Sequence, residues 1–340
     1  MRDVVVVGGG PAGLAVALGC AKAGLDVVVR EKRDGVIDKA CGEGLMPGAV
    51  RALAALGVDP PGHPIHGITY RQGTAVAHAA FRDGPGRGVR RTALHDALRA
   101  EALRHGVEVV RAPVVEVEQH ADHVRVDGSR ARYLVAADGL HSTIRDTAGL
   151  AAGNGARRPR WGLRRHYALR PFSDSVEVTW AAHSEAYVTP VAADTVGVAI
   201  LSSVRGGFDE QLAAFPDLAA KVADAEPASD VRGAGPLFQR TSGRVAGRVL
   251  LVGDAAGYID ALTGEGLALA LTTAAELVRC LSEDRPGDYD RAWTRTSRRS
   301  RWLTSGLLRA RGTPALARRV VPLSARAPGL FSFVVNQLAR

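Results

Sequence analysis

The first 33 residues constrain the fold of this chain more than any other stretch. An apolar, β-branched run of strand length, Val4 to Val7, leads directly into a glycine-rich turn, and the apolar spacing after the turn predicts a helix. A second strand-like run, Val27 to Val29, follows and leads to Glu31. The order strand, glycine turn, helix, strand is typical of a βαβ unit that binds a dinucleotide.

The turn has the Gly-x-Gly-x-x-Gly spacing in the run Gly8-Gly9-Gly10-Pro11-Ala12-Gly13. Gly8 suits a tight turn, Gly10 lets the backbone approach a pyrophosphate, and Gly13 allows close packing of helix on strand. The helix N-terminus offers unpaired N–H groups to phosphates. Glu31, 18 residues beyond Gly13, would accept hydrogen bonds from the adenosine ribose. The motif predicts a dinucleotide site and leaves FAD and NAD as alternatives.

Composition narrows the class of protein. With 340 residues, 46% hydrophobic and 23% charged, the chain fits a soluble globular protein of about two domains. The first apolar run is too short for a signal sequence, so we expect a cytoplasmic protein. Three scattered cysteines, Cys20, Cys41 and Cys280, are too few for a disulfide framework or a zinc site, and we expect no metal.

The positive charge is concentrated at the C-terminal end. Residues 291–340 hold 11 arginines and no acid, so the remaining 290 residues carry 9 − 11 = −2 of the net charge of +9. Nucleic acid is not an expected partner, because no basic-aromatic interleaving, helix-turn-helix or zinc motif occurs. The open alternatives are a membrane surface bound peripherally, an anionic carrier, or an arginine-rich helical face in solvent.

Later segments predict a second layer and a return to the first. Residues 65–81 favour a β-hairpin, and 160–240 favour antiparallel strands with turns near His183 and Asp194. We expect these strands to form one open sheet that walls a substrate site, with Tyr187 and Pro190 facing that site. Two more buried strands end in Asp-Gly and Gly-Asp pairs, at positions 138–139 and 253–254, and a second glycine-rich turn lies at 264–266.

Three sequence motifs together resemble those of the FAD-dependent oxidoreductases of the para-hydroxybenzoate hydroxylase fold. They are the glycine motif of residues 8–13 with Glu31, the Asp-Gly pair at 138–139, and the Gly-Asp pair at 253–254 with the turn at 264–266. The resemblance spans residues 1 to about 282. It implies an α/β fold, with a Rossmann-like FAD-binding domain, an inserted antiparallel-sheet substrate domain and a C-terminal helical segment. The implied boundaries are 1–64, 83–158 and 241–284 for the FAD-binding domain, 65–82 and 159–240 for the sheet, and 285–340 for the basic helices.

The resemblance also implies roles for single residues around a non-covalently bound FAD. Asp254 would bond the ribityl hydroxyls, and a helix from Gly264 would aim its N-terminus at the flavin. Arg91 would lie near the diphosphate, and Val115 would touch the adenine through its backbone. The full set of expected FAD-binding residues is Gly8, Gly10, Pro11, Ala12, Gly13, Glu31, Lys32, Arg91, Val115, Asp138, Gly139, Gly253, Asp254, Gly264, Glu265 and Gly266.

The reaction is less constrained than the cofactor. The loop Cys41-Gly42-Glu43-Gly44 resembles geranylgeranyl reductases, but Ala261 stands where those enzymes have a proline, and 187–190 lacks their aromatic-rich motif. The tryptophan pattern of flavin-dependent halogenases is absent. We favour a monooxygenase that hydroxylates an aromatic or polyketide-like apolar molecule through a flavin C4a-hydroperoxide. The alternatives are a double-bond reductase and a flavoprotein that modifies a protein side chain.

The candidate catalytic residues are Cys41, Tyr187 and His166. Cys41 lies in the reductase-like loop, where its thiol could line the site or transfer a proton, and Tyr187 and His166 are titratable groups on the expected sheet. No second glycine-rich dinucleotide unit is present. We therefore expect NAD(P)H to bind transiently as electron donor, or a separate flavin reductase to supply the electrons.

Overall fold

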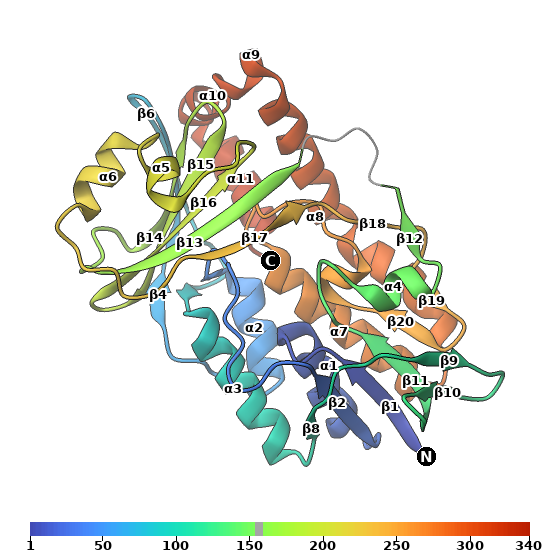
Figure 1. The fold of residues 1–340 in the computed structure, drawn as a ribbon. Coiled ribbons are helices and arrows are strands. Elements are labelled where there is room, and N and C mark those ends of the chain that lie inside the picture. The colour runs from blue at the N-terminus through green and yellow to red at the C-terminus, as the bar shows by residue number, and fades with distance from the viewer. Residues whose placement is uncertain (154–158) are drawn as a thin grey trace.

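The computed structural model describes residues 1–153 and 159–340. Its first sheet has eight strands, and its central path runs β19-β20-β11-β1-β2-β8 (Figure 1). The bounds are β1 Arg2–Val7, β2 Val27–Glu31, β8 Glu108–Arg111, β9 Val117–Gln119, β10 Val124–Val126, β11 Ser129–Ala136, β19 Val245–Ala246 and β20 Val249–Leu251. Strands β8, β2, β1, β11 and β20 run parallel, as expected of a Rossmann-like unit, while β9, β10 and β19 pair antiparallel at its margins.

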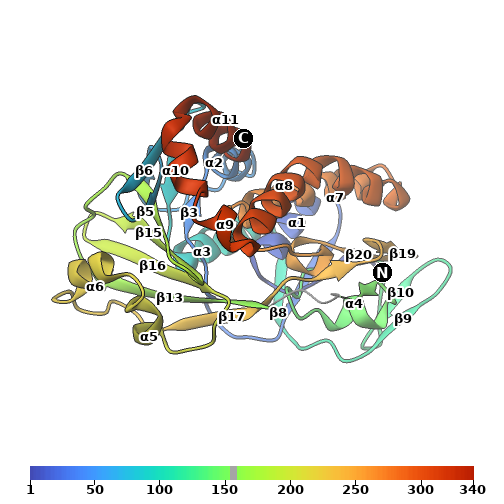
Figure 2. The ribbon, with the colours of Figure 1, turned by 90° about the horizontal axis from the view of Figure 1, so that it is seen from above.

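Helices cover this sheet and carry the segments that border the site. Helix α1 packs against both α3 and α7, and α2 also contacts α7 (Figure 2). These helices span α1 Pro11–Lys22, α2 Pro47–Ala55, α3 Arg91–Arg104 and α7 Gly266–Ser282, with the short α4 at Thr143–Thr147 and the 3-10 turn η1 at Gly253–Ala256. Cys20 on α1 and Cys280 on α7 are fully buried in this core.

The second sheet has seven strands in the order β17-β13-β16-β15-β14-β5-β6. Its strands are β5 Gly67–Gln72, β6 Ala75–Ala80, β13 Arg160–Ala168, β14 Ser175–Trp180, β15 Ser184–Ala192, β16 Thr195–Ser202 and β17 Arg232–Leu237. The predicted hairpin and the strands of 160–240 thus share one sheet, with turns after Trp180 and Ala192. The expected boundary at 158/159 adjoins residues 154–158, which lie outside the described residues.

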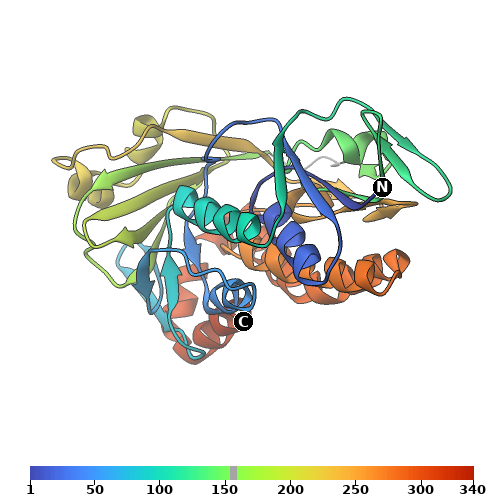
Figure 3. The same ribbon diagram turned by 90° about the horizontal axis from the view of Figure 1, so that it is seen from below.

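Each face of the second sheet has its own cover. Helices α5 Phe208–Leu212 and α6 Pro216–Val222 bury one face through Val188 and Val198, and the other face carries Tyr187 and Trp180. Helix α3 lies where the two sheets meet (Figure 3). Short strands complete the junction: β3 Gly44–Leu45, β4 His63–Ile65 and β7 Gly86–Gly88 form one small sheet, and β12 Ala151–Ala152 pairs with β18 Arg240–Thr241.

The C-terminal segment is helical, and part of it is core. A short η2, Pro286–Asp288, precedes α8 Tyr289–Gly312, α9 Pro314–Ala317, α10 Val320–Arg326 and α11 Pro328–Leu338. Val321, Phe331 and Val335 are buried against the second sheet. Other large apolar side chains of these helices are exposed, namely Trp302, Leu316, Leu323, Leu330 and Phe333. Among the described residues, no helix is long and apolar enough to cross a membrane.

Candidate functional site

The glycine turn after β1 is shaped by two different demands. Gly8 has φ +107°, and a Cβ there would stand 2.4 Å from the Ala137 carbonyl oxygen, while a Cβ on Gly13 would stand 1.9 Å from the Gly8 oxygen. The fold itself therefore requires both glycines. Gly10 is different, because its φ of −72° suits any residue and the nearest atom to its Cβ position is Arg91 Nη2, at 3.9 Å. The space before Gly10 is kept open, which fits a pyrophosphate.

The turn opens onto the N-terminus of α1. Pro11 is its first residue, and Gly10 supplies no side-chain cap, so the first N–H groups point toward the open space. A Cβ on Gly253 would stand 2.8 Å from Ala12 Cβ, which places the turn after β20 directly against α1. The structure thus brings the first and last predicted motifs together.

Glu31 lies at the end of β2, where the sequence predicts the ribose carboxylate. It is buried, and it accepts hydrogen bonds from Gly9 N at 2.7 Å and Arg33 N at 3.0 Å. Lys32 is exposed. Val115 is 88% exposed, and its N–H donates to Asp127 Oδ1 at 3.1 Å, so the expected backbone contact to adenine would use its carbonyl.

Arg91 and Asp138 carry buried polar atoms that the protein does not satisfy. Arg91 is 6% exposed, and its guanidinium approaches Gly10. Within the described part of the chain, Arg91 Nη1 and Asp138 Oδ1 are buried without a hydrogen-bond partner. Burial lowers the pKa of Arg91. A buried cation without a paired anion is unfavourable, and the diphosphate of FAD would supply that anion. These residues fit the cofactor.

Asp254 and Lys39 lie near Arg91. Asp254 is in η1, the turn that contacts α1, and Lys39 Nζ lies 3.3 Å from the Cβ position of Gly139. Both side chains are exposed to solvent. Desolvation by the protein around them nevertheless raises the pKa of Asp254 and lowers that of Lys39. Lys39 belongs to the site by position, but a single lysine in a loop carries no sequence signal for it.

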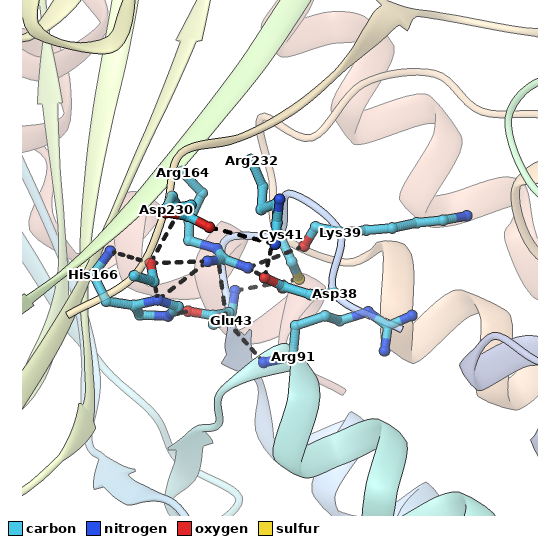
Figure 4. A network of polar contacts seen from close by, with 10 residues as sticks. Asp38, Lys39, Cys41, Glu43, Arg91, Arg164, His166, Asp230 and Arg232 are labelled. Atoms are coloured by element: carbon cyan, nitrogen blue, oxygen red, sulfur yellow. Dashed lines mark hydrogen bonds and ion pairs between the residues drawn. The ribbon is translucent and has the colours of Figure 1, made fainter. Parts of the chain in front are cut away.

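The loop Cys41-Gly42-Glu43-Gly44 is held in place by the buried carboxylate of Glu43. Glu43 is 2% exposed with φ +60°, and its Oε1 accepts from the Arg91 backbone N–H at 2.7 Å. Its Oε2 lies 2.6 Å from His166 Nε2 on β13 (Figure 4). The neighbouring Arg164 forms an ion pair with Asp38 of the same loop. One carboxylate thus joins the loop, the start of α3 and the second sheet.

His166 is held inside this network. It is 1% exposed, and its Nδ1 lies 2.8 Å from Ser229 Oγ and 3.1 Å from Arg164 Nη1. Both ring nitrogens are therefore engaged by protein groups. This arrangement favours a positioning role for His166, and its catalytic role stays a prediction.

Cys41 and Tyr187 belong to the two surfaces that face each other across the junction. Cys41 Sγ accepts from Glu43 N at 3.4 Å, and burial raises the pKa of the thiol. Tyr187 is buried, donates to the Leu262 carbonyl at 2.9 Å, and has a pKa raised by burial. Thr189, on the same face of β15 as Tyr187, donates to the Gly42 carbonyl at 2.8 Å. Tyr187 therefore faces the loop side.

The expectation that Pro190 shares this face is wrong. Side chains alternate along a strand, so Pro190 projects to the side opposite Tyr187 and Thr189. There it lines a small hollow with Pro171 and Phe172. The sequence predicts the correct strand, but the alternation of side chains along it decides which residues reach the site.

The second glycine turn begins α7. Gly264 has φ +69°, Glu265 is the N-cap, and Gly266 is the first helical residue. The Tyr258 ring lies 3.6 Å from the Cβ position of Gly266, so this tyrosine sits beside the helix N-terminus. Glu265 accepts from Ser300 Oγ at 3.0 Å, and burial raises its pKa to about 7.

Glu265 should make stability depend on pH. Its folded-state pKa of about 7 exceeds the ordinary 4.5, so between these values the unfolded chain binds fewer protons and the free energy of unfolding falls as pH rises. The loss should be at most about 3 kcal/mol. Urea unfolding at pH 5 and pH 8 should show it, and Glu265→Gln should reduce it. Glu283→Gln, at the exposed other end of α7, should leave it unchanged.

Comparisons with known proteins agree with this geometry. A family model described as FAD binding domain matches residues 1–301. Menaquinone reductase of Mycolicibacterium smegmatis is 30% identical, over 86% of this chain and 79% of the relative. Digeranylgeranylglycerophospholipid reductase 1 of Methanopyrus kandleri is 30% identical, over 79% and 77%. The 3-amino-4-hydroxybenzoate 2-monooxygenase of Streptomyces cremeus is 31% identical, over 84% and 80%.

Solved structures share the fold. A triple mutant of the flavin-dependent brominase Bmp2 superposes with a TM-score of 0.83 at 19% identity, covering 100% of this chain and 95% of the other. The Diels-Alderase PyrE3 gives 0.77 at 22% identity, covering 100% and 80%. Together with the open glycine turn and the unpartnered Arg91, these matches show that the chain belongs to the FAD binding domain family and is an FAD-dependent oxidoreductase of the para-hydroxybenzoate hydroxylase fold.

Proposed function

We propose that the protein is a monooxygenase that hydroxylates an aromatic or polyketide-like, largely apolar small molecule, with NAD(P)H as electron source. FAD, when bound, supplies the electrons and activates O2. The glycine turn, Arg91 and Asp254 would hold the cofactor, and the Tyr187 face of the second sheet would hold the substrate against it. The known relatives include both a monooxygenase and reductases, so the choice between reactions depends on the residues of this chain.

The observation that carries the proposal is a set of polar groups beside the second glycine turn, 264–266. Tyr187 is a buried phenol and Tyr258 a half-buried one. Desolvation by the surrounding protein raises the pKa of both, and the charge of Arg160 partly offsets this rise. Arg160 is itself held by Glu185 and, at 3.1 Å, by Asp260. Such groups can hold a substrate that carries ring hydroxyls or carbonyls. An isolated prenyl double bond offers them no hydrogen bond.

The proposed proton chemistry depends on Tyr187 and Cys41. Because Tyr187 donates its proton to the Leu262 carbonyl, its oxygen is free to accept a hydrogen bond from a substrate hydroxyl. Such a bond would orient a phenol and polarise its O–H bond, which makes the ring more electron-rich. Cys41 is a protonated thiol near neutral pH because burial raises its pKa, so it can donate a proton but is a poor nucleophile.

A double-bond reductase is the second candidate. It is favoured by the reductase relatives and by the Cys41-Gly42-Glu43-Gly44 loop, whose thiol could give a proton to a carbon of the reduced bond. NAD(P)H oxidation should separate the two. A monooxygenase should be stimulated by phenolic substrates only in air, whereas a reductase should be stimulated by prenylated substrates without oxygen. Stimulation by prenylated substrates alone would overturn the monooxygenase proposal.

Asp254→Ala tests the cofactor position directly. Loss of a hydrogen bond from the ribityl chain should cost about 0.5 to 1.5 kcal/mol, or up to about tenfold in FAD affinity. The fold should persist, because no described side-chain hydrogen bond of Asp254 holds it together. Fluorescence titration of the FAD-free protein measures the dissociation constant. An unchanged constant would show that Asp254 does not hold the ribityl chain.

We further propose that the exposed side of the C-terminal helices contacts an anionic membrane surface. Residues 291–340 hold 11 arginines and no acid, and Trp302 on α8 and Leu330 and Phe333 on α11 are exposed. The protein should sediment together with vesicles that carry anionic headgroups at low salt, and less of it should do so at high salt. Each arginine near the surface should contribute about 1 kcal/mol of binding free energy. Neutral vesicles should not. Equal failure to bind either kind would return these helices to the solvent-exposed alternative.

A further inference from the structure

A cavity of about 530 Å3 lies between the segment that follows β17 of the second sheet and helix α8. Phe238 and Ile259 supply its apolar wall, and Arg240, Arg301 and Arg309 supply guanidinium groups. Phe238 has φ +102°, a backbone conformation that is costly for a bulky residue. None of these residues belongs to the predicted FAD-binding set.

Residues 257–259 lie between the cavity and the start of α7, where the flavin is expected. Tyr258 and Gln239 exchange backbone hydrogen bonds of 2.9 and 2.7 Å, which fix this segment to the strand end beside it. The Tyr258 ring turns toward Gly266 and α7, whereas Ile259 lines the cavity. Arg301 Nη1 lies 3.9 Å from the Cβ position of Gly257. A ligand in the cavity would therefore contact the same short segment whose Tyr258 faces the start of α7, where the flavin is expected.

The positive charge of Arg244 and Arg301 is only partly compensated by carboxylates of the described residues. The guanidinium carbons of Arg244 and Arg301 lie 3.7 and 5.0 Å from the centre of the Trp293 ring, so two cations share one indole. Arg244 is paired with Asp290 at 3.5 Å. In residues 1–153 and 159–340, no carboxylate lies within ion-pair distance of Arg301. Burial and the charges of Arg244 and Arg240 lower the pKa of Arg301. An anion would relieve this repulsion.

We propose that this cavity binds the phosphate group of a reactant. Guanidinium groups match phosphate oxygens in shape and charge, Ser305 can donate a further hydrogen bond, and Phe238 and Ile259 can cover the carbon skeleton next to the phosphate. The phosphate belongs either to a phosphorylated apolar substrate or to the 2′-phosphate of NADPH. That it belongs to a reactant rests on the proposed function, whereas phosphate binding itself does not.

Calorimetric titration of the FAD-loaded protein with inorganic pyrophosphate tests the site without turnover. FAD must be present, because without it the glycine turn of residues 8–13 would also bind the probe. Pyrophosphate should bind the wild type, and Arg301→Gln should weaken binding about tenfold or more. Arg298→Gln, an exposed arginine of the same helix outside the cavity, is the matched control and should bind normally. If Arg301→Gln loses its fold or FAD, Arg309→Gln at the exposed rim replaces it.

Competition then identifies the source of the phosphate. Displacement of pyrophosphate by NADPH but not NADH would assign the cavity to the electron donor. Displacement by dodecyl phosphate, more tightly than by inorganic phosphate, would assign it to an apolar phosphorylated substrate. Failure of both to displace pyrophosphate would overturn the claim that a reactant binds there. Absence of pyrophosphate binding, or binding by Arg301→Gln and Arg309→Gln equal to that of the wild type, would overturn the phosphate site itself, whatever the turnover assays show.

Discussion

Gly10→Val should yield a folded protein that contains almost no FAD. The backbone of Gly10 suits valine, and among the described residues other than its chain neighbours no atom lies closer than 3.9 Å to its Cβ position. The added side chain therefore occupies only the open space before the turn. That space is where the pyrophosphate must approach. Loss of two charge-assisted hydrogen bonds, at about 1.5 kcal/mol each, already corresponds to about a hundredfold in affinity.

Gly207→Val is the matched control for Gly10→Val. Gly207 is also a helix N-cap in extended backbone, with φ −67°, and in residues 1–153 and 159–340 no atom outside its chain neighbours lies within 4 Å of its Cβ position. This variant should keep both its fold and its FAD. Flavin absorbance per protein and the far-UV spectrum measure the two properties. A yellow Gly10→Val protein with normal FAD affinity would contradict a pyrophosphate bound at the Gly10 turn.

Arg91→Met should have opposite effects on the two forms of the protein. With FAD, the loss of charge-assisted hydrogen bonds to phosphate should cost about 1.5 to 3 kcal/mol, or about 10- to 150-fold in affinity. Without FAD, thermal stability should hold or rise, because the variant removes a buried cation that has no paired carboxylate in the described part of the chain. The hydrogen bond to Glu43 should survive, since the Arg91 backbone donates it.

The control is Arg99→Met on the same helix, which should leave FAD affinity unchanged. Melting curves with and without FAD, together with an FAD titration, give all the required values. If the FAD-free Arg91→Met protein loses several degrees in melting temperature, the guanidinium stabilises the FAD-free fold. That result would contradict the view that its main role is to bind the diphosphate.

The sequence predicts the parts of the site whose chemistry is local along the chain. Gly8, Gly10, Gly13 and Glu31 lie within one βαβ unit, so their spacing alone predicts their geometry. The two separate segments of the second sheet are also predicted, because strand alternation and turn residues are local signals. The resemblance to a family adds Asp254, which the structure places close to α1.

Other parts depend on pairing across long sequence separations. Glu43 and His166 are 123 residues apart, and nothing in either neighbourhood predicts that one would satisfy the other. Lys39 lies in a loop whose position depends on distant residues, among them Arg164, which donates to the Lys39 carbonyl. Pro190 shows a related limit, since a shift of one residue along a strand reverses the face. Burial of a polar residue becomes interpretable only when its partner is known.

Turnover under labelled O2 separates hydroxylation from double-bond reduction in a single measurement. The purified holoenzyme, NAD(P)H and a panel of phenolic and polyketide-like candidates are incubated under 18O2, and products are analysed by mass spectrometry. We expect a product that gains one labelled oxygen atom, with no product formed under anaerobic conditions. Anaerobic turnover that saturates a carbon–carbon double bond and incorporates no label would contradict the monooxygenase and establish the reductase.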